Sequence, residues 1–349
     1  MTTARARIPL TLLTGFLGSG KTTLLKHILS LPNMSGTVVL INEFGEIGLD
    51  HLLVRAVHGN TVVLQNGCVC CSLQTDLQQG LRDVIDSRGP GGPGDFHRIV
   101  IETTGLADPA PIVQTLTIDP MLRHQVQLVS TIATVDAVNG EAQLDAYAEC
   151  LRQAAIADQL VITKSELVLP STLARIRERL SALNPTARIY DRQDPRFDPD
   201  DLVERGFAEP TNALSQVRRW LADGYATKPS RFVAEWSGPH GSNISSLAVR
   251  ITGAIDWSAF AVWLTALLHR HGQKILRIKG LLNVADTLDP VVLHGIQHLI
   301  YPPVCLEEWP DNDRDTRLIF IVDGIDTTAL ENSLTVFLAA AKNRRLKPL

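Results

Sequence analysis

The residues with the clearest chemical potential form a glycine-rich segment near the start of the chain, Gly15-Phe-Leu-Gly-Ser-Gly-Lys-Thr22. It matches the pattern G-x-x-x-x-G-K-[ST], between an apolar run that we expect to be a strand and a segment that we expect to be a helix. Glycines let successive backbone N–H groups turn towards phosphate oxygens, and the helix N-terminus adds a positive dipole. Lys21 would reach the β- and γ-phosphates, and the hydroxyl of Thr22 would bind Mg²⁺. The predicted phosphate-binding residues are Gly15, Gly18, Ser19, Gly20, Lys21, Thr22 and Thr23.

A second segment that suits a phosphate site is Ile99-Val-Ile-Glu-Thr-Thr-Gly105, a strand of buried type that ends in a carboxylate and is followed by a glycine. In P-loop hydrolases an acid at a strand end organises Mg²⁺ or its water, and a glycine loop responds to the γ-phosphate. Because Glu is one methylene longer than the commoner Asp, we expect Glu102 to contact metal-bound water. We therefore assign Glu102 to catalysis together with Lys21, and Gly105 to nucleotide binding.

A base-selecting loop is predicted at Thr163-Lys-Ser-Glu166, directly after the apolar run 160–162. Guanine is usually selected by an Asn/Thr-Lys-x-Asp loop, in which the lysine stem covers the ring and the carboxylate accepts two N–H bonds. Glu166 replaces the aspartate but keeps the carboxylate, and adenine offers no comparable pair of donors. Thr163, Lys164 and Glu166 are therefore assigned to guanine binding, with a surface turn that begins another helix as the alternative.

Three of the five cysteines are crowded into Asn66-Gly-Cys-Val-Cys-Cys71. In an extended segment Cys68 and Cys70 point to one side and Cys71 to the other, so a turn is needed to gather the three thiolates. Thiolates bind Zn²⁺, Cu(I) or Co²⁺ well, and three of them leave one position for an exchangeable ligand. A metal site is favoured here over redox pairing and over simple packing.

Acidic residues also follow the second expected strand, in Asn42-Glu-Phe-Gly-Glu-Ile-Gly-Leu-Asp50. Glu43, Glu46 and Asp50 lie where a nucleotide-sensing loop would be. They could steady Mg²⁺, position the attacking water or assist the thiolate-bound metal. We place Glu43 among the catalytic residues and leave these roles open.

The composition favours a soluble protein of two domains. The 349 residues exceed what one ordinary domain needs, and 45% hydrophobic with 20% charged residues is usual for globular proteins. No run of eighteen apolar residues occurs, so no membrane span is expected. A net charge of −4 without a dense basic tract argues against a nucleic-acid partner. The odd number of cysteines suits a reducing cytosol, and the apolar N-terminal segment leads into the glycine loop, so we expect a cytoplasmic protein without a cleaved signal.

The alternation of β-branched runs with helical stretches predicts an α/β fold, a mostly parallel sheet flanked by helices. Strands are expected at residues 9–14, 37–42, 61–64, 98–102, 128–135, 160–163 and 188–190. Helices are expected at residues 22–31, 75–88 and 173–183, and the Gly/Pro-rich residues 89–94 should form a surface loop.

A second, smaller α+β domain is predicted after a proline-rich stretch. The pattern degrades from residue 191 to 243, which we interpret as a linker with one amphipathic helix near 214–222. Strands are then expected at 246–251, 274–283, 291–299 and 317–322, and helices at 256–271, with Asp256 as N-cap, and at 327–342. The predicted boundaries are 1–190, 191–243 and 244–349.

With these residues assembled, the chain resembles the CobW/YjiA-like family of P-loop GTPases, metal chaperones related to the urease and hydrogenase nickel-insertion GTPases. In the first domain the resemblance is carried by Gly15–Thr23, Asn42-Glu-Phe-Gly45, Gly67-Cys-Val-Cys-Cys71, Glu102-Thr-Thr-Gly-Leu-Ala-Asp-Pro109 and Thr163–Glu166. In the second it is carried by Trp263-Leu264, Leu276-Arg-Ile-Lys-Gly280, Val291–His298 and Trp309. It covers nearly the whole chain.

The resemblance implies slow hydrolysis of GTP to GDP with Mg²⁺. It also implies that Zn²⁺ or Co²⁺ binds to Cys68, Cys70 and Cys71 and is handed to a client metalloprotein. A homo-oligomer is left open. Two departures from the family pattern stand out: Glu166 in place of aspartate, and ten scattered histidines with no metal-storing His-rich tract. His294 and His298 are interpreted as structural residues at a strand-to-helix junction.

Two other functions stay open. A small-molecule P-loop kinase would share the segment Gly15–Thr22 but would not need the cysteines. A nucleotide-gated binding switch would recruit a partner without moving metal.

Overall fold

The computed structural model describes residues 7–42, 61–64, 73–88, 96–203, 214, 217–218, 221, 231–237 and 243–345. It divides into two compact units, which are described separately. The first comprises Met1–Gln143, Arg152–Ile176 and Ile189–Ala208, and the second comprises Leu144–Leu151, Arg177–Arg188 and Glu209–Leu349. The domain boundaries drawn from the sequence stay a prediction.

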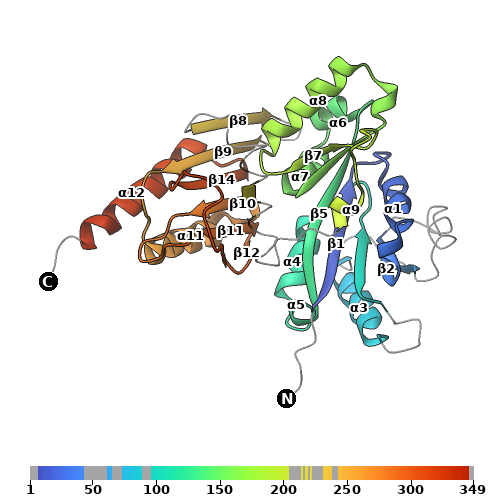
Figure 1. The fold of residues 1–349 in the computed structure, drawn as a ribbon, viewed down its shortest axis with the longest axis horizontal. Coiled ribbons are helices and arrows are strands. Elements are labelled where there is room, and N and C mark those ends of the chain that lie inside the picture. The colour runs from blue at the N-terminus through green and yellow to red at the C-terminus, as the bar shows by residue number, and fades with distance from the viewer. Residues whose placement is uncertain are drawn as a thin grey trace. The chain divides into compact units, whose positions relative to one another are not determined.

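The first unit is built on a seven-stranded sheet with the order β3-β2-β4-β1-β5-β6-β7 (Figure 1). The strands are β1 (Ile8–Gly15), β2 (Thr37–Asn42), β3 (Thr61–Leu64), β4 (Arg98–Glu102), β5 (Val126–Asp136), β6 (Gln159–Thr163) and β7 (Arg188–Asp191). Every pairing from β3 to β6 is parallel. The expected parallel sheet is confirmed, and each predicted strand end lies within two residues of the observed one.

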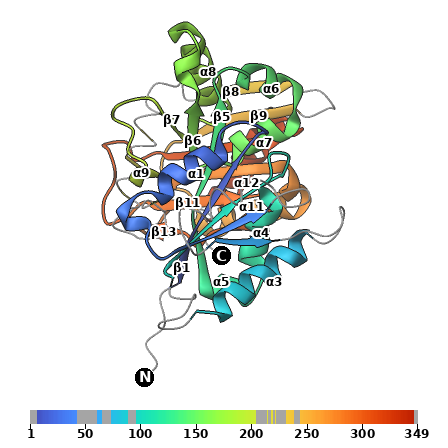
Figure 2. The same ribbon diagram turned by 90° about the vertical axis from the view of Figure 1, so that its right-hand side faces the viewer.

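Helices lie on both faces of this sheet, with α1 on one side and α4 on the other (Figure 1). The helices along this part of the chain are α1 (Lys21–Leu29), α3 (Leu73–Asp86), α4 (Ala110–Ile118), α5 (Leu122–Gln125), α6 (Gly140–Ala146), α7 (Ala148–Ile156), α8 (Pro170–Leu183) and α9 (Asp200–Val203), with 3₁₀ turns at Pro32–Met34 and Ser165–Leu167. Parts of α6, α7 and α8 belong to the second unit. Figure 2 shows α3, α4 and α5 together, and these helices contact one another. The three expected helices are present, with ends shifted by at most three residues.

The core of the first unit explains the apolar runs of its strands. Leu24, Leu25, Ile28 and Leu29 are buried at helical spacing on α1 and pack against strand residues such as Val39. Since helices cover both faces, successive residues of β2 and β6 are buried rather than alternate ones. The ends of the parallel strands are thereby held at fixed positions, and the loops that follow them are where a site can be built.

The second unit contains a seven-stranded antiparallel sheet with the order β12-β11-β10-β14-β9-β8, in which β13 also pairs with β11. Its strands are β8 (Arg231–Ser237), β9 (Asn243–Ile251), β10 (Ile275–Leu282), β11 (Val291–Ile296), β12 (Leu299–Ile300), β13 (Val304–Cys305) and β14 (Thr316–Asp323). The helices α11 (Trp257–His271) and α12 (Thr327–Arg345) contact each other and share one core with the sheet (Figure 1). The expected α+β architecture is confirmed.

The predicted N-cap of α11 is also confirmed. The side chain of Asp256 accepts a hydrogen bond from the backbone N–H of Ala259 at 2.9 Å. Such a cap satisfies one of the N–H groups that have no partner within the helix. Trp263, further along α11, packs edge to face on Phe320 of β14, which joins the helix to the centre of the core.

Two expectations about the second half of the chain differ from the structure. The segment predicted as a linker contains β8, which pairs along its whole length with β9. The strand was not predicted because it is short and lies between Pro229 and Pro239. The single strand expected at 291–299 is wrong, because β11 ends at Ile296 and the chain turns back into β12. Gln297 makes this turn with a φ of 51°, a conformation that a non-glycine residue rarely adopts.

The same turn corrects the placement of the two histidines. His294 lies within β11, and His298 follows Gln297 in the turn, so neither marks a strand-to-helix junction. The ring of His298 packs directly on Gly272, where a Cβ would collide with it. The ring of His294 stacks on Tyr301 with 4.8 Å between centroids.

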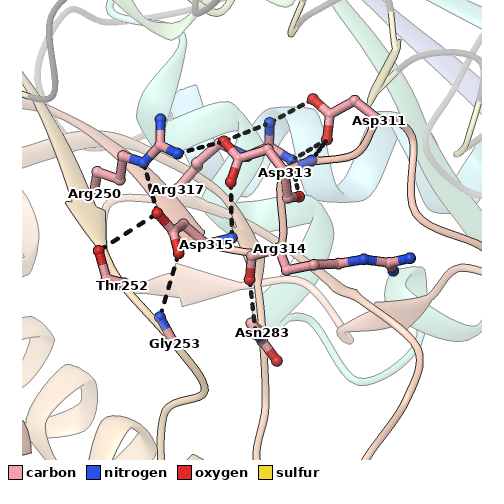
Figure 3. A network of polar contacts seen from close by, with 9 residues as sticks. All are labelled: Arg250, Thr252, Gly253, Asn283, Asp311, Asp313, Arg314, Asp315 and Arg317. Carbon is pink, nitrogen blue, oxygen red and sulfur yellow. Dashed lines mark hydrogen bonds and ion pairs between the residues drawn. The ribbon is translucent and has the colours of Figure 1, made fainter.

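A network of aspartates and arginines fixes the segment that leads into β14 (Figure 3). Arg317, with a side chain only 3% exposed, pairs with Asp311 at 2.6 Å and with Asp313 at 3.5 Å. Arg250 of β9 pairs with Asp313 and Asp315, and its hydrogen bond lowers the pKa of Asp315. Each of the three aspartates is paired with at least one of the two arginines, so we assign the network to structure.

Within the residues that the structure describes, no helix has the length and apolar character needed to cross a membrane.

Candidate functional site

The phosphate loop lies between β1, which ends at Gly15, and α1, which begins at Lys21. Gly18 and Gly20 have φ values of 70° and 90°, in the left-handed region that favours glycine. A Cβ on Gly15 would lie 2.6 Å from the carbonyl oxygen of Thr134 on β5. The hydroxyls of Ser19 and Thr134 are also 2.6 Å apart. The loop is thus attached to β5. A larger residue would clash at Gly15 and would be strained by the positive φ at Gly18 and Gly20.

The ammonium group of Lys21 is folded back over this loop. It donates hydrogen bonds to the carbonyl oxygens of Gly15 at 2.9 Å and Phe16 at 3.1 Å. Thr23, in the same first turn of α1, is exposed. A phosphate oxygen is a stronger, charged acceptor for an ammonium group than a carbonyl oxygen. Lys21 is therefore placed where a bound phosphate would compete for it.

The hydroxyl of Thr22 donates a hydrogen bond to Oε1 of Glu102 at 2.8 Å. Glu102 is 5% exposed and stands at the end of β4, the strand that pairs with β1. The parallel register therefore brings together two predicted residues that are 80 positions apart. Hydroxyl and carboxylate oxygens are the hard ligands that Mg²⁺ prefers, so this pair fits the cation.

The loop after β4, residues 103–108, is attached to the phosphate loop and its strand. Thr103 donates from its backbone to Leu13 and from its hydroxyl to Thr14, both at 2.9 Å. A Cβ on Gly105 would lie 2.6 Å from the backbone nitrogen of Leu17, so only glycine allows this contact. Gly105 is therefore in direct contact with the phosphate loop, as a residue that responds to the γ-phosphate must be.

The predicted base loop begins at the end of β6. The buried hydroxyl of Thr163 donates to the carbonyl oxygen of Ser19 at 2.7 Å, so this side chain joins the base loop to the phosphate loop. Lys164 has a φ of 57°, and Glu166 is exposed in the 3₁₀ turn that follows. The hydroxyl of Ser165 donates to Asp191 at the end of β7.

One residue of this region was missed by the sequence reasoning, Asp136 at the end of β5. Its carboxylate is 2.7 Å from Nζ of Lys164 and accepts hydrogen bonds from the backbone N–H of Val138 and the amide of Asn139. Burial raises its pKa, but the hydrogen bonds from Lys164, Asn139 and Val138 outweigh burial and lower the pKa. The available signal was an acid at the end of a buried strand, the same signal that identified Glu102.

The remaining predicted residues, Glu43, Glu46, Asp50, Cys68, Cys70 and Cys71, lie outside the described residues. In the described part of the chain, no group of three or more His, Cys, Asp or Glu side chains is arranged to hold a metal ion.

Burial raises the pKa of Cys150 to about 12, so its thiol stays protonated at neutral pH. Cys305 on β13 is exposed.

Two family models match the chain. Residues 9–191 match the model described as CobW/HypB/UreG, nucleotide-binding domain. Residues 244–338 match the model described as cobalamin synthesis protein cobW C-terminal domain.

Two curated relatives match over most of their length and a third over about half of it. The zinc chaperone YjiA of Escherichia coli is 33% identical over 316 residues, which cover 90% of this chain and 93% of the relative. The zinc chaperone CobW of Pseudomonas aeruginosa is 27% identical, with 96% and 92% covered. The zinc-regulated GTPase metalloprotein activator 1 of Schizosaccharomyces pombe is 34% identical, with 61% and 53% covered.

Among solved structures, a Zn(II)-bound triple mutant of YjiA GTPase superposes with a TM-score of 0.68 at 25% identity. The alignment covers 95% of this chain and 99% of that one. The fold expected from the sequence is shared with this structure.

Proposed function

The chain belongs to the CobW/HypB/UreG family and is a metal-handling GTPase, and from this premise we propose that it loads a thiophilic divalent metal and delivers it to a client metalloprotein under the control of GTP. The family membership expected from the sequence is confirmed. Because the family members are GTPases, the alternative function of a small-molecule P-loop kinase has no support.

The observation that carries the nucleotide part of the proposal is the contact between Thr22 and Glu102, at 2.8 Å beside Lys21. Phosphoryl transfer asks a protein chiefly for positioning and for charge stabilisation. Lys21 would exchange its carbonyl partners for β- and γ-phosphate oxygens, and the N–H groups of the phosphate loop would hold the same oxygens. Thr22 and Glu102 would hold Mg²⁺, directly or through water, and this cation neutralises charge on the phosphates.

The water that attacks the γ-phosphate needs an orienting group. We assign this role to Glu43, with Glu102 as the acid that organises the phosphate side. Gly105, which contacts Leu17 of the phosphate loop, would sense whether the γ-phosphate is present.

Guanine is proposed to bind over the stem of Lys164, with the carboxylate of Glu166 accepting its two N–H bonds. The left-handed backbone of Lys164 and its ion pair with Asp136 support this geometry, because they fix the lysine before a base arrives. Glu166 is exposed and therefore accessible to a ligand.

The metal is the cargo of this protein, and we propose that Cys68, Cys70 and Cys71 bind it. Zinc is favoured over cobalt because the relatives are named zinc chaperones and the structural neighbour is Zn(II)-bound. Three thiolates leave a fourth position open for exchange, which suits transfer better than permanent storage.

Zinc affinity in different nucleotide states tests the proposal. We would measure Zn²⁺ binding by chelator competition in the reduced protein with a non-hydrolysable GTP analogue, with GDP and without nucleotide, always with Mg²⁺. Metal should bind more tightly in the GTP state, and a coupling of about 1–3 kcal/mol corresponds to a roughly 5- to 150-fold difference. Replacing the three cysteines by serine should remove the difference while GTP binding persists. Equal affinities in all states would refute delivery and favour the binding switch.

A further inference from the structure

A buried glutamine holds the loop that follows β4. Gln153 of α7 is 1% exposed, and its Nε2 donates to the carbonyl oxygens of Gly105 at 3.1 Å and Ala107 at 3.0 Å. Both partners are acceptors, so the amide nitrogen must face them and the orientation of the side chain is determined. One carboxamide therefore fixes two peptide groups of the loop, on either side of Leu106.

The position is unusual for a polar residue. The other buried residues in the same half of α7, Ala154, Ala155 and Ile156, are apolar and belong to the core. An apolar residue at 153 would fit the pattern of the helix and would avoid the cost of burying a carboxamide. The buried carboxamide instead makes two hydrogen bonds to the loop, which points to a function of the loop.

The loop 103–108 is also attached at both of its ends. Thr103 ties its start to β1, and Gly105 touches Leu17. At the other end Asp108 accepts a hydrogen bond from the backbone N–H of Ala110, the first residue of α4, and lies 3.7 Å from Arg152, the neighbour of Gln153. Between these ends, Gln153 of α7 contacts the loop backbone at two carbonyl oxygens.

We propose that Gln153 is a positioning residue for GTP hydrolysis: it holds Gly105 and Ala107 so that the loop 103–108 meets the γ-phosphate in a productive position. This inference rests on the proposed role of Gly105. Catalysis by positioning is steep, since a displacement of about 1 Å can cost about 100-fold in rate. GDP lacks the γ-phosphate and would not use the loop, so its binding should not depend on Gln153.

The first unit contains a matched control, Gln159 of β6. It is 6% exposed, and its Nε2 donates to the hydroxyl of Ser130 at 2.9 Å and to the carbonyl oxygen of Leu202 at 3.0 Å. Gln159 thus has the same burial class and the same number of donated bonds as Gln153. Neither of its partners belongs to the loop 103–108 or to the phosphate loop.

The test compares Gln153→Met with Gln159→Met in the full-length protein. Methionine keeps the length of the side chain and removes the donors, so both variants should lose similar thermal stability. Only Gln153→Met should lower kcat for GTP, by about 10- to 100-fold. It should also lower the ratio of affinities for a non-hydrolysable GTP analogue and GDP, while GDP affinity stays within about twofold of wild type.

Wild-type kcat and affinity ratio in Gln153→Met would overturn the inference, and so would equal losses in both variants. If Gln153→Met does not fold, Gln153→Asn replaces it. The shorter amide cannot reach both carbonyl oxygens, so this variant should show a smaller loss of kcat and of the affinity ratio. Zinc affinities test the proposed function, and the nucleotide ratio tests this inference, so each can fail without the other.

Discussion

The substitution Asp136→Asn should destabilise the first unit in a pH-dependent way. The carboxylate of Asp136 is 1% exposed and accepts bonds from Lys164 at 2.7 Å, from the amide of Asn139 at 3.0 Å and from Val138 at 2.8 Å. Asparagine can keep the bond from Val138 but turns an NH₂ group towards the other donors. A bond to a charged group is worth about 1.5–3 kcal/mol and a neutral one about 0.5–1.5 kcal/mol.

The net loss is smaller than the sum of these bonds. Lys164 is 35% exposed, so water can solvate part of its charge when the carboxylate is gone. Asparagine also avoids the cost of burying a charge. We therefore expect Asp136→Asn to lower the free energy of unfolding by about 1–3 kcal/mol at pH 7.

The pH dependence follows from the lowered pKa of Asp136. A carboxyl whose pKa is lower in the folded than in the unfolded state contributes stability above its unfolded value of about 3.9. That contribution is lost as the pH falls through the folded pKa. The difference between wild type and Asp136→Asn should thus be constant from pH 8 to pH 5 and shrink below about pH 4.

Urea denaturation followed by far-UV circular dichroism measures this difference. Tryptophan fluorescence is unsuitable, because all five tryptophans lie at or beyond residue 220. Asp145→Asn is the control: this carboxylate pairs with Arg179 but is 68% exposed, so its loss should cost less than about 0.5 kcal/mol. Parallel pH profiles for wild type and Asp136→Asn, without convergence in acid, would show that the ion pair with Lys164 contributes nothing to stability.

Three predictions concern the nucleotide site. Lys21→Ala should abolish GTP hydrolysis with an unchanged circular dichroism spectrum, and normal turnover in this variant would exclude the phosphate-loop assignment. Glu102→Gln should slow single-turnover hydrolysis by about 10²- to 10³-fold while GTP affinity changes by less than about tenfold, as expected for an acid that acts on the transition state; a loss confined to binding would contradict that role. Glu166→Ala should reduce the preference for GTP over ATP in a competition assay, and an unchanged preference would mean that another group selects the base.

Much of the nucleotide site could be predicted because each part follows a strand. The phosphate loop, Glu102 and Thr163 all come directly after buried runs, and parallel strands bring such ends to the same edge of a sheet. The contact between Thr22 and Glu102 is the outcome of that rule. The pattern of strands and helices after residue 243 also predicted the second, α+β domain, which the antiparallel sheet and its two helices confirm.

Residues that act through tertiary contacts were not predictable in this way. Gln153 lies 48 positions from Gly105, and a glutamine in a short helix resembles a solvent-exposed residue until the helix is packed. The turn after β11 was missed for a different reason. Gln297 carries no turn signal, and the apolar residues on both sides of it continue the pattern of a single strand.

The hydrogen bond from Thr163 to Ser19 has a consequence for how nucleotide preference can change in evolution or by engineering. The residue that opens the base loop is also a structural part of the phosphate loop, so the two segments do not vary as independent modules. A loop grafted from an ATP-specific protein would have to bring a hydroxyl to position 163, or the phosphate loop would lose its support. Descendants of this chain can therefore change the exposed Glu166 long before they can change Thr163.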